Sequence, residues 1–195
     1  MASTPSRKAL THERILETAA RTLRSSGCSG VGVADVMKAA GLTHGGFYAH
    51  FPSRDALIAE ALAHAGRDSN QRLERRAHQA LARGESPLHA LVNSYLSEAH
   101  ATHPEQGCAV AALASEMPRQ APEVQDAARD RVRALIDNVR RSLPDGTDPQ
   151  QALVITSAMV GALQLARALG PGEQATAVLQ TTRDALLAPF APSIH

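Results

Sequence analysis

The chain has 195 residues, of which 44% are hydrophobic and 20% charged, a balance typical of a globular protein rather than a disordered one. Aromatic residues make up only 3% and alanine is abundant, so the composition favours helices over a large sheet. Two cysteines are too few for a disulfide framework, and a reducing cytoplasm is the expected location. We expect no membrane association, because no unbroken apolar run reaches about 18 residues and residues 1–10 do not resemble a secretory signal.

The charge is unevenly distributed, although the net charge is only +1. Residues 1–50 hold six Lys or Arg and three Asp or Glu, whereas the rest of the chain holds slightly more acidic than basic residues. A small basic head on a slightly acidic body suits a head that contacts a polyanion.

The N-terminal part of the chain predicts two helices followed by a tight turn. Apolar residues at helical spacing predict a first helix between an N-cap at Thr11 and a stop at Gly27. A second, shorter helix is expected over Val33–Ala40, with Gly32 at its N-cap position and Gly41 at its end.

Two more helices are expected after this turn. The third covers about Thr43–His50 and is closed by Phe51-Pro52. Ser53 caps the fourth, which ends near Gly66. The third helix contains the adjacent pair Gly45-Gly46, which weakens a helix by roughly 1 kcal/mol per glycine but lets the backbone approach a partner closely. Helix, tight turn and helix together indicate a helix-turn-helix, whose second helix enters the major groove of DNA.

The remainder of the chain continues as helices. They are expected over residues 73–81, 88–99, 108–117, 124–143, 148–169 and 173–188. The helix at 148–169 is apolar nearly all round, so it must be buried on more than one side. We expect this helix and the terminal one at 173–188 to form a homodimer interface, a four-helix bundle across a two-fold axis. A central helix in a monomeric bundle is the alternative.

The stretch from Arg14 to Leu57 resembles the DNA-binding domain of the TetR/AcrR family of bacterial repressors. The resemblance is carried by the string AGLTxGxFYxHFxSRxxL, which starts at Ala40, and by these residues before it: Ile15, Leu16, Ala19, Leu23, Gly27, Asp35, Val36 and Ala39.

The resemblance implies an all-α fold with a three-helix helix-turn-helix DNA-binding domain in residues 1–52 and a connecting helix at 53–66. It implies a C-terminal helical bundle for ligand sensing and dimerisation in residues 67–195. The implied function is a homodimeric repressor that a small-molecule, electrophile or oxidant signal releases from a palindromic operator on double-stranded DNA.

The resemblance also implies roles in DNA binding for individual residues. Contacts to phosphates would come from the Thr43 and Tyr48 hydroxyls, the Arg54 guanidinium and the basic residues Lys8 and Arg7. Facing the base edges would be His44, Gly45 and His50. Phe47 and Phe51 would pack in the core. Two residues depart from the family pattern: Gly46 stands where relatives often carry a base-reading side chain, and Gly32 replaces the usual Ser or Thr cap.

The C-terminal part gives less information about an effector. After residue 51 the only aromatic residues are Tyr95 and Phe190, which suits a small, aliphatic or reactive effector better than a flat multi-ring one. Cys108 opens an apolar helix, with His100 and His103 nearby in the sequence. The stretch from Gly107 to Glu116 is similar to a stretch in a TetR subgroup, some of whose members respond to electrophiles or oxidants through that cysteine. We therefore expect Cys108, Tyr95 and His100 to sense the effector, with a redox-sensing repressor switched at Cys108 as one form of this hypothesis.

Several alternatives stay open from the sequence. Cys108 could be a small buried side chain that fills a gap. A metal site from His100, His103 and Cys108 matches no common zinc spacing, and we expect no metal and no cofactor. An enzyme is not expected, because the chain has no P-loop, GxSxG or HExxH motif. An all-helical protein-interaction module without DNA contact would leave the basic head unexplained.

Overall fold

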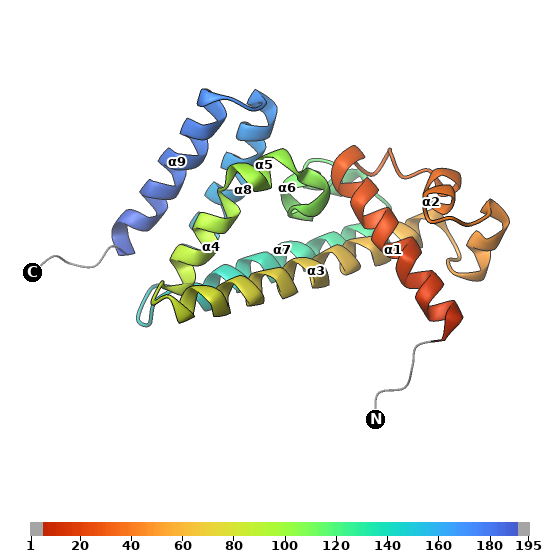
Figure 1. The fold of residues 1–195 in the computed structure, drawn as a ribbon, viewed down its shortest axis with the longest axis horizontal. Coiled ribbons are helices and arrows are strands. Elements are labelled where there is room, and N and C mark those ends of the chain that lie inside the picture. The colour runs from red at the N-terminus through yellow and green to blue at the C-terminus, as the bar shows by residue number, and fades with distance from the viewer. Residues whose placement is uncertain (1–5, 191–195) are drawn as a thin grey trace, which may run out of the picture. The chain divides into compact units, whose positions relative to one another are not determined.

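The computed structural model describes residues 6–190, and over this range the chain consists of helices and turns without any strand (Figure 1). The predicted all-α fold is therefore confirmed. Within the longest helix, nothing is described of the side chains at positions 70, 73, 74 and 76–78. The α-helices are α1 (Arg7–Ser26), α2 (Val33–Ala39), α3 (Arg54–Ala82), α4 (Pro87–Tyr95), α5 (Glu98–Thr102), α6 (Ala109–Leu113), α7 (Pro122–Ser142), α8 (Gln151–Leu169) and α9 (Glu173–Leu187). The 3₁₀ helices are η1 (His44–Ala49), η2 (Pro104–Gln106), η3 (Met117–Arg119) and η4 (Ala188–Phe190).

The helices form two compact units, each assembled from two stretches of the chain. The first unit contains the residues up to Asp68 together with Cys108–Arg131, and the second contains Ser69–Gly107 together with the residues from Val132 onward. The residues around α6 and η3 thus pack with the N-terminal helices. The functional division into a DNA-binding domain at 1–52 and a sensing domain at 67–195 stays a prediction.

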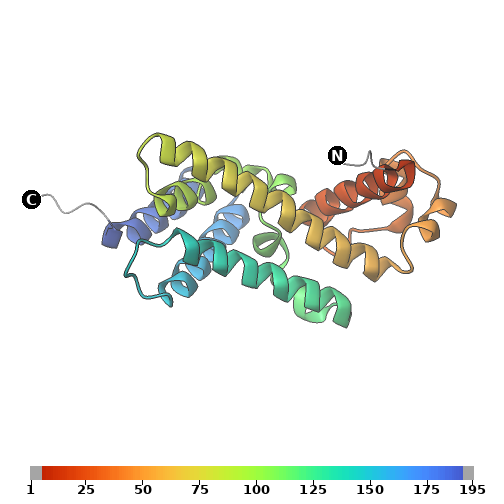
Figure 2. The ribbon, with the colours of Figure 1, turned by 90° about the horizontal axis from the view of Figure 1, so that it is seen from below.

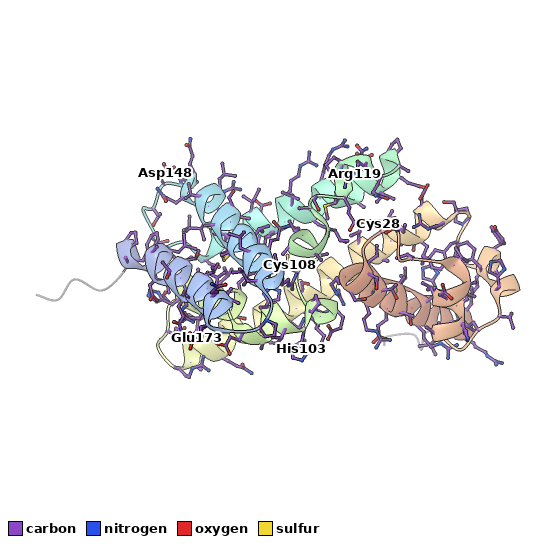
Figure 3. All side chains as sticks on the ribbon, turned by 90° about the horizontal axis from the view of Figure 1, so that it is seen from above. Cys28, His103, Cys108, Arg119, Asp148 and Glu173 are labelled. Atoms are coloured by element: carbon purple, nitrogen blue, oxygen red, sulfur yellow. The ribbon has the colours of Figure 1, made fainter. Side chains whose placement is uncertain are left out.

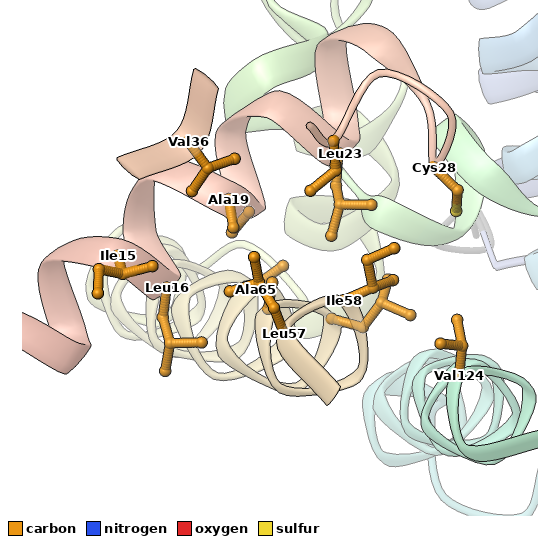
Figure 4. Close-up of a cluster of buried hydrophobic side chains, with 14 of the residues drawn as sticks. Ile15, Leu16, Ala19, Leu23, Cys28, Val36, Leu57, Ile58, Ala65 and Val124 are labelled. Atoms are coloured by element: carbon orange, nitrogen blue, oxygen red, sulfur yellow. The ribbon is translucent and has the colours of Figure 1, made fainter. Parts of the chain in front are cut away.

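The first unit is built around one buried apolar cluster, most of which is drawn in Figure 4. Helix α1 contributes residues at helical spacing, among them Ile15, Ala19 and Leu23, and α3 faces them with Leu57 and Ile58. The cluster also includes residues from α6 and α7, so that side chains distant in sequence share one core. Burial of such side chains contributes about 1.5–3 kcal/mol each, which fixes α1, α2 and η1 on α3.

Helix α1 begins one turn earlier than the sequence predicts. Ser6 occupies the N-cap position and its side chain accepts a hydrogen bond from the Ala9 amide at 3.2 Å. The predicted cap at Thr11 is wrong, because the Thr11 hydroxyl donates to the Arg7 carbonyl inside the helix instead. The predicted stop at Gly27 is confirmed, with φ of +74°.

Helix α3 runs through the position where the sequence predicts a break. Ser53 caps it as expected, since the Ser53 hydroxyl accepts from the Ala56 amide at 2.9 Å. Gly66 does not end the helix: it is absent from the glycines with positive φ. A side chain at Gly66 would stand only 2.6 Å from Cζ of Arg131, so the glycine leaves room for the Arg131 side chain of α7 rather than ending the helix.

In the second unit α8 packs along α9 and also contacts α4 and α5; α8 and α9 are the two blue helices in Figure 2. A hydrogen bond of 2.8 Å from the Thr176 hydroxyl to Glu98 adds a polar link between α9 and α5. Pro87 opens α4 at its first turn, and Ser86 caps it. This α4 ends at Tyr95, and a separate cap at Ser97 starts α5.

Helix α8 differs from the expectation that the chain has no segment of membrane-spanning character. Its 19 residues are long enough, and on average apolar enough, to span a membrane, although they include the polar residues Thr156, Ser157 and Gln164. It is also the element that carries Leu153, Val154, Leu165 and Leu169, each at least half exposed.

Candidate nucleic-acid interface

The turn between α2 and η1 is tight and is closed by backbone hydrogen bonds. Gly41 adopts φ of +70°, a conformation that favours glycine. The Gly41 amide donates to the Lys38 carbonyl and the Leu42 amide donates to the Met37 carbonyl, each at 2.9 Å. The turn therefore fixes how η1 leaves α2.

Two phenylalanines anchor η1 in the core of the first unit. Phe47 and Phe51 are each only 1% exposed, and their rings stack with centroids 5.7 Å apart. Their predicted place in the core is confirmed. The expected third helix is present as a 3₁₀ helix, His44–Ala49, because the glycine pair leaves little to favour a regular α-helical turn.

The opposite face of η1 is open to solvent. Thr43, His44 and Gly45 are exposed, and the Tyr48 ring is 72% exposed. Thr43 occupies the N-cap position, but its hydroxyl makes no capping bond within the described residues. The Thr43 hydroxyl thus lies at the N-terminus of η1 and does not cap it.

The two glycines of η1 have different surroundings. A side chain added at Gly45 would meet no described atom within 4 Å, so packing in the unit gives no reason for a glycine there. A side chain at Gly46 would stand 3.7 Å from the Met37 methyl group, an ordinary contact. Gly46 is half-buried and lies against α2 rather than at the open face.

His50 is half-buried beside a second histidine. Its ring lies 5.9 Å from that of His12, and among the described residues its Nδ1 has no hydrogen-bond partner. Burial, followed by the nearby His12 and Lys8, lowers the pKa of His50 below its ordinary value. His50 therefore favours its neutral form, and only part of its ring is available to DNA. Lys8 lies exposed on the first turn of α1.

Arg54 is used within the unit. Its Nε donates to the Val31 carbonyl at 2.8 Å and its Nη2 donates to the Cys28 carbonyl. Its Nη1 lies 3.8 Å from the Asp55 carboxylate. The family resemblance implied that this side chain contacts a phosphate, and nothing in the sequence indicated its hydrogen bonds to the loop after α1.

The predicted sensor residues fall into both compact units. Tyr95 and His100 come together in the second unit, with ring centroids 4.8 Å apart and the His100 Nδ1 2.8 Å from the Tyr95 carbonyl. Arg167, which the sequence did not single out although it is the one charged residue of α8, donates to the His100 carbonyl at 2.9 Å. Cys108 belongs to the first unit, where it is the N-cap residue of α6 and is half-buried.

The two cysteines, labelled in Figure 3, are not joined to each other. Cys28 is buried on the loop after α1, and burial together with the Glu116 carboxylate raises the pKa of its thiol to about 11, even though Arg54 acts in the opposite direction. Across the described residues, no group of three or more His, Cys, Asp or Glu side chains is arranged to hold a metal ion.

Comparison with known proteins assigns the family. The model for bacterial regulatory proteins of the tetR family matches residues 15–61. A relative described as an uncharacterised HTH-type transcriptional regulator, found in two strains of Mycobacterium tuberculosis, is 30% identical over 166 residues, which cover 80% of this chain and 83% of the relative.

Solved structures show the same fold. The reduced form of NemR from Escherichia coli superposes with a TM-score of 0.74 at 20% identity, covering 90% of this chain and 94% of NemR. A TetR transcriptional regulator from Chloroflexus aurantiacus has a TM-score of 0.74 at 24% identity, covering 93% of this chain and 94% of that regulator.

Family membership decides between the classes of protein left open by the sequence. TetR-family proteins are non-enzymatic regulators that bind DNA, which sets aside both an enzyme and an interaction module without DNA contact. The chain belongs to the TetR family of bacterial regulatory proteins and is a DNA-binding transcriptional regulator.

Proposed function

We propose that this regulator is a homodimeric repressor that binds a palindromic operator and leaves it in response to a small-molecule, electrophile or oxidant signal. The observation that carries the proposal is the two-sided construction of η1. One side is fixed in the core by Phe47 and Phe51, and the other presents Thr43, His44 and Tyr48 to solvent. An element held in this way can enter a major groove without losing its own packing.

The contacts to DNA divide into two kinds. The Thr43 and Tyr48 hydroxyls, with the Lys8 ammonium, would bind phosphates and fix the protein on the duplex. His44 and the backbone at Gly45 would face base edges, and His50 would contribute the part of its ring that is not buried. Gly46 would supply no side chain, so the base readout at η1 would rest on few groups.

The apolar surface of α8 supports a dimer. Leu153, Val154, Leu165 and Leu169 are exposed by 50–59%. Large side chains gathered on one helix and exposed to this extent are typical of an interface. The proposed partner is a second copy of the chain, which would cover α8 and α9 across a two-fold axis and present two copies of η1 to the operator.

Gly161 gives a second argument for contact at α8. It lies in the middle of the helix, where glycine is less stable than alanine by about 1 kcal/mol. An added Cβ there would meet no described atom within 4 Å, so the glycine is not required by the chain's own packing. Gly161 stands one turn before Leu165, and a close approach of the partner helix would explain it.

The dimer can be tested with one charged residue on α8. In Leu165→Glu, a carboxylate would be buried at the interface, so the molar mass in light scattering should fall from two chains to one. Leu81→Glu is the matched control, because Leu81 is exposed to a similar degree, 55%, near the end of α3. A dimer that persists in Leu165→Glu would contradict the proposed interface.

Two signals are compatible with the sensing residues. A small effector would contact Tyr95 and His100, whereas an electrophile or oxidant would act on Cys108. The relative NemR was solved in a form described as reduced, which makes a redox signal worth testing here. N-ethylmaleimide should then release operator DNA from the reduced wild type but not from Cys108→Ser. Operator binding that is unchanged, or that changes equally in both proteins, would leave Cys108 as a packing residue.

The regulator would act in the cytoplasm and not at a membrane. Although α8 is apolar enough to span a bilayer, its buried side contacts α9, α4 and α5, and its exposed side is the proposed dimer interface. A core helix of a water-soluble protein can have this hydropathy.

Selection of bound sequences from random duplex DNA tests the proposal as a whole. A palindrome should emerge whose half-sites are about 34–36 Å apart or a multiple of this distance. Binding to it should weaken steeply with salt, by a slope of roughly 0.9 for each phosphate contact. Enrichment of a sequence without two-fold symmetry would contradict the dimeric operator.

A further inference from the structure

The loop between α1 and α2, residues 27–32, depends on side chains from elsewhere in the chain. It begins at the helix stop Gly27 and leads to α2, whose N-cap residue Gly32 has no side chain with which to cap the helix. Backbone groups in such a loop need other partners when they are partly buried. The placement of α2 therefore depends partly on what holds this loop, in addition to the burial of Val36 and Met37 in the core.

Two side chains of opposite charge hold the two backbone groups of Cys28. The Cys28 amide donates to Oε2 of Glu116 at 2.9 Å, and the Cys28 carbonyl accepts from Nη2 of Arg54. Arg54 also donates to the Val31 carbonyl near the end of the loop. Hydrogen bonds with an ionised partner are roughly twice as strong as neutral ones.

The Glu116 carboxylate lies directly against the end of α1. A Cβ added at Gly27 would collide with Oε1 of Glu116 and stand 3.0 Å from its Cδ. Glycine is thus favoured at this position both by its positive φ and by the approach of the carboxylate. The carboxylate thus occupies the space that a side chain at position 27 would need.

Glu116 belongs to the segment that follows α6, 88 residues away from Cys28. Ala109 and Leu113 of α6, and Met117 next to Glu116, are buried in the same cluster as α1. The position of α6 therefore determines where the Glu116 carboxylate stands, and a shift of α6 would pull on the loop or release it.

We propose that Glu116 is a positioning residue for DNA binding: together with Arg54 it holds the α1–α2 loop, so that operator affinity depends on the position of α6. Since α2 supports η1 through the turn at Gly41, a loop released from Glu116 lets the recognition element leave its binding position. The proposal deepens the proposed function and rests on operator binding by the wild type.

Removal of the carboxylate should weaken operator binding. We expect Glu116→Ala to lose affinity on the order of tenfold, and Glu116→Gln to lose less because its amide oxygen can still accept the bond. Asp126→Ala is the matched control: it removes one acidic residue from the same unit, and Asp126 is paired with Arg129 on the exposed face of α7. The control should bind the operator at least as well as the wild type.

The salt dependence of binding separates positioning from phosphate contact. If Arg54 holds the loop, Arg54→Ala should lower affinity without changing the slope of log affinity against log salt. If it binds a phosphate, the slope should fall by about 0.9 per contact. Because both residues act on Cys28, the double variant Arg54→Ala with Glu116→Ala should lose less than the product of the two single losses.

A structural role alone would not produce reciprocal coupling. Because coupling between two sites is mutual, operator DNA should slow amide hydrogen exchange in α6 of the wild type, and Glu116→Ala should abolish this protection. If Glu116→Ala does not fold, Glu116→Gln replaces it, and the operator-induced protection of α6 should then be reduced rather than abolished, because the amide oxygen can still accept the bond.

The proposal would be overturned if the Glu116 variants bound the operator as tightly as Asp126→Ala. It would also be overturned if operator DNA still protected α6 to the wild-type extent in the absence of the carboxylate. Neither result would affect the conclusion that the protein binds the operator. A wild type that binds no selected duplex would overturn the proposed function itself.

Discussion

At the scale of single residues, Tyr48 is the most direct test of how the regulator holds DNA. Its ring is 72% exposed on η1, next to the buried Phe47. Tyr48→Phe should leave the fold intact but weaken binding to every duplex by about 1.5–3 kcal/mol per lost contact to a charged phosphate. Gel shifts with the operator and with an unrelated duplex measure both losses. A loss confined to the operator would instead assign Tyr48 to a base.

The lowered pKa of His50 predicts that the folded protein loses stability at acidic pH. Its pKa is lowered in the folded protein, chiefly by burial, whereas the unfolded chain has the ordinary value near 6.5. Between the two pKa values the unfolded state binds more protons than the native state, so the free energy of unfolding should decrease as the pH falls from about 6.5 to the folded-state pKa and should level off below it.

Urea unfolding at about pH 7 and about pH 5, on either side of the ordinary histidine pKa, measures this effect. His50→Gln should lose less stability between the two conditions than the wild type. His44→Gln is the control, because His44 is exposed on the same element. An identical loss in wild type and His50→Gln would exclude this role for His50.

The two cysteines should differ in reactivity. The Cys28 thiol is 2% exposed and its pKa is raised to about 11, so it stays protonated near neutral pH. N-ethylmaleimide should therefore modify Cys108, which is half-buried, well before Cys28. Peptide mass mapping after a short exposure checks this order, and earlier labelling of Cys28 would contradict it.

At the scale of elements, local signals in the sequence predict most helices but not all of their ends. Ser53, Pro87 and Gly41 act locally, through a cap, a first-turn proline and a left-handed turn, so their effects are visible from the sequence. Gly66 is a glycine like Gly41, but it does not form a turn: it makes room for the side chain of Arg131, which is distant in sequence. The sequence pattern does not show this contact, so a helix end was wrongly predicted at Gly66.

The glycine in α8 allows a prediction that separates the helix from the interface. Gly161→Ala should stabilise an isolated helix by about 1 kcal/mol. If a partner helix approaches closely at this point, the same change should weaken dimerisation, as measured by sedimentation over a range of concentrations. A dimer of unchanged affinity would show that Gly161 is not at a close contact between chains.

At the scale of the whole molecule, the sequence predicts the open face of the candidate site better than its support. Thr43, His44 and Tyr48 follow one another in one motif, and their exposure agrees with the predicted face of the element. The contact between Glu116 and Cys28 joins residues 88 positions apart and has no local signature. Arg54 was expected to contact a phosphate, and two of its nitrogens donate to carbonyls of the loop after α1, which the sequence did not indicate.

In the proposed function, a signal would pass through the packing of residues 108–131 with the N-terminal helices. Cys108 begins this segment and Glu116 lies within it, so a change at Cys108 would act on an element whose core is shared with α1. A ligand can shift the equilibrium only by its differential affinity for two states, and the position of α6 is the proposed difference between them.

Hydroxyl-radical footprinting on the selected operator tests most directly the claim that two copies of η1 bind one duplex. Two protected patches related by two-fold symmetry are expected, with centres about 34–36 Å apart or a multiple of this distance, and both should be lost in Leu165→Glu. A single patch, or two patches that persist when the chain is monomeric, would contradict this claim.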